Sequence, residues 1–205
     1  MTNKLKIYGF SNESFVDGPG IRVVVFVQGC DNACPSCHNP ESWDINGGDE
    51  YTIRDIVKKI KKSSGRTNGD VLQFAKKALS RKVRGVTFSG GEPFLQAEAL
   101  VQIAQAVKPL GLDITTYTGH IYEELAQSPD ESIQALLKIT DYLIDGPYIH
   151  EKRNIGLKFR GSSNQRIIDM NETRKASEVV LYEELGNQFS STVIPALSRN
   201  PLAAT

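Results

Sequence analysis

Apolar and polar residues follow one another along this chain in blocks that predict strands and helices in alternation. Residues 21–27 are nearly all β-branched and apolar, and Gly29 follows them, which is typical of a buried strand in a parallel sheet. Shorter apolar runs at residues 86–88, 113–117 and 141–145 predict further strands, each followed by glycine-containing turns. The chain is therefore expected to build a sheet from short buried strands.

Apolar residues at helical spacing predict helices between these strands. Thr52 and Asp55 resemble a capping box at the start of one such helix. Further helices are expected after Asp70, over residues 95–107, and from a capping Ser128 to about residue 138. Strands alternating with helices favour an α/β fold in which helices cover a mainly parallel sheet.

The length and the end of the chain predict its domain organisation. The 205 residues fit a single domain with a real core, which we expect to span residues 1–185. Residues 186–205 carry one charge, two prolines and no periodic pattern. We therefore expect them to form a disordered tail.

Charge and hydropathy exclude several classes of partner. Lys and Arg together number 24, as do Asp and Glu, so the net charge is zero and no bulk attraction to nucleic acid or to a membrane surface is expected. The sequence has no signal-peptide shape at its start and no apolar run of about 20 residues. We expect a cytoplasmic protein.

The three cysteines of the chain carry the clearest chemistry. Cys30, Cys34 and Cys37 form a C-x3-C-x2-C run, and an odd number so closely spaced indicates metal binding in a reducing compartment rather than disulfides. A structural zinc site could add His38 as a fourth ligand, although the side chains of adjacent residues tend to diverge. A [4Fe–4S] cluster would instead keep one iron without a protein ligand, which suits catalysis.

A second motif follows the predicted strand at residues 86–88. Gly90 and Gly91 lack Cβ atoms, so the backbone there can approach a ligand closely, or the pair can simply form a turn. Glu92 could accept a hydrogen bond from an ammonium group, or it could cap the helix that follows Pro93.

Together these motifs resemble the radical S-adenosylmethionine (SAM) superfamily. Residues 17–22, 28–30 and 37–43 are similar to activating enzymes of glycyl-radical enzymes. Residues 118–120, 143–148 and 160–166 resemble the branch that activates anaerobic (class III) ribonucleoside-triphosphate reductase, and the Arg-Gly-Ser-Ser-Asn-Gln run at residues 160–165 selects that branch.

This resemblance implies a fold, cofactors and a reaction. The fold would be a single-domain, open (β/α)6-type partial barrel of about six strands. A [4Fe–4S] cluster would bind SAM, and an electron from a donor such as flavodoxin would cleave it to methionine and a 5′-deoxyadenosyl radical. This radical SAM oxidoreductase would then take a hydrogen atom from a glycine of its protein substrate, the glycyl-radical subunit of the reductase.

The resemblance also implies site residues, with no catalytic side chain beyond the cluster and the SAM site. Ser36 and His38 would line the adenosyl pocket, and the Gly-Gly-Glu motif would hold the methionine end. Thr118 is a pocket candidate, whereas Asp145 either binds ribose or ammonium or is only a turn residue. The expected metal ligands are Cys30, Cys34 and Cys37, and the expected cofactor-binding residues are Ser36, Cys37, His38, Gly90, Gly91, Glu92, Thr118 and Asp145.

Several alternatives stay open at this stage. His38 is also common in activases of pyruvate formate-lyase, so another glycyl-radical enzyme could be the substrate, and a small-molecule radical SAM enzyme such as a deazaguanine synthase is a more distant rival. A zinc-stabilised binding module without catalysis is the rival from another class. Residues 160–166 either contact the partner's glycine loop or form a surface turn. Arg22 follows a glycine turn at the start of a predicted strand and could simply pair with an acidic residue at the surface.

Overall fold

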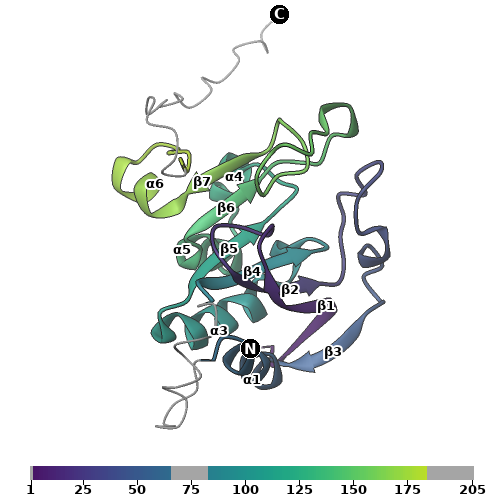
Figure 1. Cartoon of the computed structure of the whole chain (residues 1–205), viewed down its shortest axis with the longest axis vertical. Helices are drawn as coiled ribbons and strands as arrows, with labels where there is room; N and C mark the ends of the chain where they lie inside the picture. Colours follow the sequence, from purple (N-terminus) through teal and green to yellow (C-terminus); the bar gives the residue numbers. More distant parts are fainter. Residues whose placement is uncertain (1, 66–82, 184–205) are drawn as a thin grey trace, which may run out of the picture.

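The computed structural model describes residues 2–65 and 83–183, which form one α/β domain around an open sheet (Figure 1). Seven strands are present in these residues. The strands are β1 (Lys4–Ser14), β2 (Arg22–Val27), β3 (Asp49–Thr52), β4 (Gly85–Gly90), β5 (Asp113–Tyr117), β6 (Tyr142–Asp145) and β7 (Arg166–Asp169). Their order across the sheet is β3-β1-β2-β4-β5-β6-β7.

The centre of the sheet is parallel and its edges are antiparallel. Strands β2, β4, β5 and β6 pair in parallel, so their carboxyl ends meet at one edge of the sheet. Strands β1, β3 and β7 pair antiparallel to their neighbours. The predicted α/β class and open single-domain architecture are confirmed, but the sheet has seven strands rather than about six, and only its centre is parallel.

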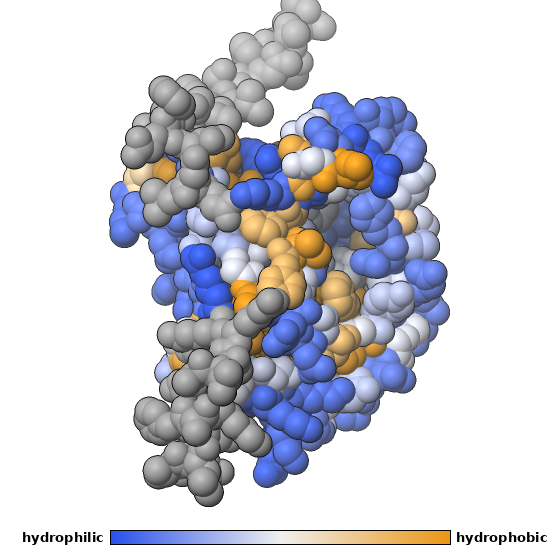
Figure 2. Space-filling model, viewed as in Figure 1, coloured by the Kyte–Doolittle hydropathy of each residue, from blue (hydrophilic) through white to orange (hydrophobic). Residues whose placement is uncertain are grey.

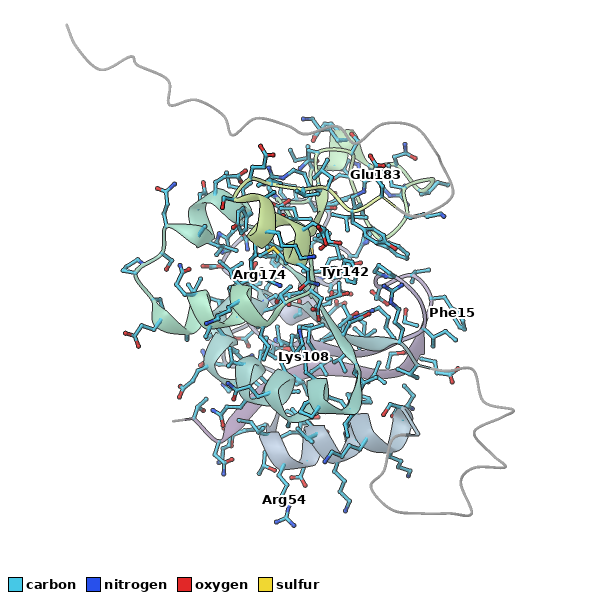
Figure 3. The ribbon with its side chains drawn as sticks, turned by 90° about the vertical axis from the view of Figure 1, so that its left-hand side faces the viewer. Phe15, Arg54, Lys108, Tyr142, Arg174 and Glu183 are labelled. Atoms are coloured by element: carbon cyan, nitrogen blue, oxygen red, sulfur yellow. The ribbon has the colours of Figure 1, made fainter. Side chains whose placement is uncertain are left out.

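Helices cover the sheet and close the core. Helix α3 contacts both α1 and α5, and Figure 3 shows the three helices stacked in front of the strands. Among the described residues, none of the helices has the length and apolar composition of a membrane span. The helices are α1 (Ile53–Ser63), α3 (Ala97–Val107), α4 (Tyr122–Ala126), α5 (Glu131–Ile139) and α6 (Met170–Ala176), with short 3-10 turns η1 (Pro40–Ser42), η2 (Pro93–Gln96), η3 (Lys108–Leu110) and η4 (His150–Lys152).

One of the two predicted helix caps is confirmed, and the other is wrong. Thr52 caps α1 as expected, because its Oγ1 accepts a hydrogen bond from Asp55 N at 3.1 Å. Helix α5 begins at Glu131 with Asp130 as its cap, so the predicted start at Ser128 was wrong. Ser128 instead accepts from Asp130 N, which caps a turn before the helix.

Two further predictions concern parts of the chain that the structure leaves undescribed. The helix expected after Asp70 and the tail expected at residues 186–205 lie outside the described residues. The helix predicted over residues 95–107 is present as α3, preceded by the 3-10 turn that begins at Pro93.

Arg22 does pair with an acidic residue, but it lies in the core, so the predicted surface location was wrong. Its side chain is fully buried at the start of β2 and pairs with Asp113 at 2.6 Å. The guanidinium also donates to Thr87 Oγ1 at 2.6 Å, to Pro19 O at 2.9 Å and to Val86 O at 2.8 Å. Burial lowers the pKa of Arg22, and Asp113 opposes that shift. Arg22 thus ties the turn before β2 to β4 and β5.

Candidate functional site

The cysteine loop leaves the sheet at the carboxyl end of β2, where open α/β sheets place their ligands. Its ends are held together because Cys30 N donates to Trp43 O at 3.2 Å. Within the loop Cys37 N donates to Cys34 O at 3.1 Å, and all three thiols are free and partly exposed. The loop therefore presents three accessible sulfur ligands from one short segment.

Two residues of this loop have left-handed backbone conformations. Ala33 has a φ of 43° and Ser36 a φ of 58°, and each directly precedes a cysteine, Cys34 and Cys37 respectively. Such conformations in residues other than glycine cost about 1–3 kcal/mol each and concentrate at ligand-binding sites. The strain is consistent with a loop shaped to present its cysteines.

The three thiols of the loop can be compared with the ligands that one zinc ion or a [4Fe–4S] cluster requires. Four ligands around one zinc lie about 3.8 Å apart, given a Zn–S distance of about 2.3 Å and tetrahedral geometry. In the described part of the chain, no three His, Cys, Asp or Glu side chains are grouped closely enough to hold a single ion. A cubane holds each thiolate on a different iron and so spaces the sulfurs more widely. Three free cysteine thiols on one loop fit a [4Fe–4S] cluster that keeps one iron without a protein ligand.

A cavity of about 880 Å³ lies beside the last cysteine. This volume is within the range of about 300–1,000 Å³ that small-molecule sites occupy. Figure 2 shows apolar residues, in orange, beside the hollowed upper right part of this face. The walls come from the cysteine loop, the strand ends and the β6–β7 connection, and include Cys37, His38, Ser89, Tyr117, Tyr148 and Phe159.

The Gly-Gly pair lets the ends of β2 and β4 approach each other. Gly90 ends β4 with a φ of 100°, in the left-handed region that favours glycine. A Cβ on Gly91 would lie 2.1 Å from Gly29 O. Gly91 N also donates to Val27 O at 2.8 Å, and Glu92 N donates to Gly29 O at 2.8 Å. These glycines therefore fix where the cysteine loop begins, and their contact with a ligand remains a prediction.

Replacing Gly91 by alanine should destabilise this crossing. We expect Gly91→Ala to lower the free energy of unfolding by about 3 kcal/mol, because backbone must move to relieve the 2.1 Å contact. Urea unfolding of the purified variant would measure the loss. Gly9→Ala is the control, since its nearest neighbour would lie at 3.7 Å, and equal losses in the two variants would contradict the argument.

Glu92 is buried and bonded to protein groups on both of its oxygens. Oε1 accepts from Phe94 N at 3.0 Å, which confirms the capping role that the sequence left open. Oε2 accepts from Gly119 N at 2.8 Å and from Asn32 Nδ2 at 3.1 Å. Burial raises the pKa of Glu92, and the hydrogen bonds from Gly119 N and Phe94 N oppose the shift. A contact between Glu92 and the methionine end of SAM remains a prediction.

Asp145 is the last residue of β6, and Thr118 directly follows the last residue of the neighbouring strand β5. Thr118 is buried, and its Oγ1 accepts from His120 N at 3.1 Å. Asp145 is fully buried, accepts from Arg166 Nε at 3.0 Å and from Tyr122 N at 2.8 Å. Asp145 is therefore more than a turn residue. A ribose or ammonium group bound to Asp145, as predicted, would have to share its carboxylate oxygens with Arg166 and Tyr122.

The structure brings the predicted residues into two groups. Cys37 and His38 line the cavity, whereas Ser36 is exposed and is absent from the described residues that line it. The second group lies around Glu92 at the strand ends. Cys30 belongs to it, because the Asn32 side chain links the cysteine loop to Glu92. The His38 ring lies against Tyr148, another residue that lines the cavity, with 5.2 Å between the ring centroids.

The run at residues 160–166 contributes Arg160, Gly161 and Gln165 to the wall of the cavity. Gln165 organises it, since Oε1 accepts from Gly161 N at 2.9 Å and Nε2 donates to Gly146 O at 3.1 Å. The expected loop is present up to Gln165, and Arg166 starts β7. Contact with a partner protein remains a prediction for this segment.

Tyr117 is a site residue that the sequence did not single out. It ends β5, lines the cavity, and donates from its hydroxyl to Phe159 O at 2.8 Å. Burial raises its pKa far above the ordinary value, so the hydroxyl stays protonated. Its place at the carboxyl end of a parallel strand was the one signal available. Tyr117 holds the β6–β7 connection over the cavity.

Comparisons with known proteins agree with this site. A family model described as "4Fe-4S single cluster domain" matches residues 16–168. A pyruvate formate-lyase-activating enzyme from Clostridium pasteurianum is 40% identical over 129 residues, which are 61% of this chain and 49% of that enzyme. The chain thus spans about half the length of that relative.

A second relative and one solved structure are also similar to this chain, over different shares of their length. An anaerobic ribonucleoside-triphosphate reductase-activating protein from Vibrio cholerae is 36% identical over 156 residues, which are 74% of this chain and 90% of that protein. The crystal structure of QueE from Escherichia coli has a TM-score of 0.36 at 14% identity, and covers 57% of this chain and 53% of that one. So partial an overlap with QueE supports no argument.

Proposed function

Because this chain belongs to the 4Fe-4S single cluster domain family, we propose that it is a radical SAM enzyme that activates anaerobic ribonucleoside-triphosphate reductase. The observation that carries the proposal is the three-cysteine loop at the carboxyl end of a parallel sheet, beside an open cavity. The Vibrio cholerae relative, matched over 90% of its length, supports the choice of reductase.

The cofactors would supply the electron-transfer chemistry, and the polypeptide would hold and shelter them. When bound, a [4Fe–4S] cluster supplies one-electron reductive cleavage of SAM, which yields methionine and a 5′-deoxyadenosyl radical. Cys30, Cys34 and Cys37 would hold three of its irons. His38 and Tyr117 would shelter the adenosyl group from water, which protects a reactive radical from side reactions.

The protein substrate has to bring a glycine into this cavity. The glycine Cα would then give up a hydrogen atom to the 5′-deoxyadenosyl radical, which would leave 5′-deoxyadenosine and a glycyl radical on the partner. The electron that starts the reaction comes from outside, and a flavodoxin-type donor is our proposal. Three free thiols suit a reducing compartment, so we place this reaction in the cytoplasm.

The cavity mouth offers an apolar rim for that glycine segment. Phe15, Val16 and Ile155 line the cavity yet are 53%, 72% and 88% exposed. Phe15 projects from the edge of the molecule in Figure 3. Large apolar side chains this exposed are typical of interaction sites when they gather in one place. We propose that they bind the residues flanking the partner's glycine.

Charges placed on this rim should separate binding of the partner from cleavage of SAM. We expect Val16→Asp and Ile155→Asp each to lower the yield of glycyl radical at least about tenfold, because a charge would replace an apolar contact. SAM cleavage without the partner should stay unchanged. The two yields would be measured by electron paramagnetic resonance (EPR) and by chromatography of 5′-deoxyadenosine.

A matched control lies on a different loop. Ile45 is 61% exposed and is absent from the described residues that line the cavity, so Ile45→Asp adds the same charge away from the mouth. A similar fall in glycyl radical in the control would assign the effect to general repulsion and remove the rim from the binding surface.

The proposed function is tested by mixing the protein with candidate partners. Anaerobically reconstituted protein, SAM and dithionite would be added to anaerobic ribonucleoside-triphosphate reductase or to pyruvate formate-lyase. We expect the EPR doublet of a glycyl radical only with the reductase. A signal only with the lyase would favour the second candidate, which the Clostridium pasteurianum relative at 40% identity supports.

A further inference from the structure

Asn32 lies two residues after the first cysteine, and its side chain connects a cysteine sulfur to a buried carboxylate. Its Nδ2 is 3.1 Å from Glu92 Oε2 and 3.8 Å from Cys30 Sγ. An amide nitrogen carries two hydrogens, so it can donate to both acceptors together. Asn32 is thus a bridge between the cysteine loop and the loop that follows β4.

The surrounding backbone fixes this side chain in place. Gly119 N donates to the same Glu92 Oε2 at 2.8 Å, and a Cβ on Gly119 would lie 2.7 Å from the Asn32 amide. Because a carboxylate only accepts hydrogen bonds, Asn32 has to present its nitrogen to Glu92. The same nitrogen therefore faces Cys30 Sγ.

His120 and Asp31 lie near this bridge. His120 Nε2 lies 3.9 Å from Glu92 Oε2 and 4.0 Å from Asp31 Oδ1. These separations are too long for direct hydrogen bonds, so neither contact replaces the one from Asn32. The 1% exposure of Glu92 also keeps water from competing for its oxygens.

We propose that Asn32 is a positioning residue that raises the reduction potential of the cluster through an N–H···S hydrogen bond to Cys30, and that Glu92 holds the amide in that orientation. The proposal rests on the proposed function, because it requires a cluster on the three cysteines. Hydrogen bonds to cluster sulfurs favour the more negative, reduced state and are a main control of the potential.

The test compares two identical substitutions at equivalent places in the loop. Asn32 and Asn39 each lie two residues after a cysteine, but at Asn39 it is the backbone N that donates to Cys37 Sγ, at 3.4 Å. Asn32→Leu should therefore remove a donor to sulfur, and Asn39→Leu should keep one. Both variants and the wild type would be reconstituted and titrated without SAM, following the reduced cluster by EPR.

The expected result is a more negative midpoint for Asn32→Leu alone. At the wild-type midpoint, where half of the clusters are reduced, we expect about a quarter or less to be reduced in Asn32→Leu. Asn39→Leu should remain close to the wild type. An unchanged midpoint in Asn32→Leu with full iron content would overturn the inference.

Assembly of the cluster is checked separately by iron and sulfide analysis. If Asn32→Leu loads no cluster, Asn32→Ala takes its place, with the same negative shift expected. Failure of both variants to load a cluster that Asn39→Leu loads would assign Asn32 a purely structural role and overturn the inference. A wild type without a four-iron cluster would instead overturn the proposed function.

Discussion

Cys34→Ser should abolish SAM cleavage while leaving the fold intact. Serine is a poor ligand for iron, so the loop would lose one of three anchors for the cluster, and the rate should fall by at least about a thousandfold. Cys34 is partly exposed on a loop and is absent from the buried hydrophobic core that the described residues form. The free energy of unfolding should therefore change by less than about 1 kcal/mol.

Three measurements on one preparation would check this expectation. Iron and sulfide analysis gives the cluster content, chromatography of 5′-deoxyadenosine gives the cleavage rate, and thermal unfolding gives the stability. Glu41→Gln is the control, since Glu41 is exposed in the same loop. A full cluster and normal cleavage in Cys34→Ser would contradict the proposed ligand set, whereas stoichiometric zinc in the wild type would favour the binding module.

Local sequence patterns predicted two kinds of element. These are strands made of one continuous buried run, and helices with one buried face. The run at residues 21–27 became β2, whose residues are nearly all buried, and α1 begins where Thr52 caps it. Strand β1 was not predicted because its burial does not alternate regularly. Its pairing with β2 shifts register between Ile7 and Gly9 and again between Ser11 and Ser14, which breaks the two-residue period.

The chemistry-bearing motifs were also visible in the sequence, but not the contacts that hold them. The three cysteines and the Gly-Gly pair can be recognised from their spacing and residue types. The bridge from Asn32 to Glu92 joins residues 60 positions apart, so no local pattern indicates it. The same holds for Tyr117, whose partner Phe159 lies 42 positions away. Long-range hydrogen bonds of this kind follow from the sheet topology.

Arg22 is the strongest case of a role that topology alone decides. At the start of β2 the sequence shows only a charged residue after a glycine turn. In the fold, Asp113 and Thr87 from two other strands meet its guanidinium in the core. Removing a fully buried guanidinium whose donors are all bonded is strongly destabilising, because the acceptors that it leaves in the core lose their hydrogen bonds.

We therefore expect Arg22→Met to lower the free energy of unfolding by about 3–5 kcal/mol. Methionine fills a similar volume, so the loss would report the missing hydrogen bonds to Thr87, Pro19 and Val86 rather than a cavity. Urea unfolding followed by circular dichroism would give the midpoint and the slope for the variant and the wild type.

Arg84→Met provides the matched control for this prediction. Arg84 pairs with the same Asp113 at 2.8 Å, but its side chain is 43% exposed, so its removal should cost less than about 1 kcal/mol. Equal losses would mean that the charge on Asp113, and not the burial of Arg22, governs the effect. A large loss only for Arg22→Met would instead show that the buried Arg22 side chain stabilises the turn before β2. The same side chain would then also stabilise the adjoining cavity mouth.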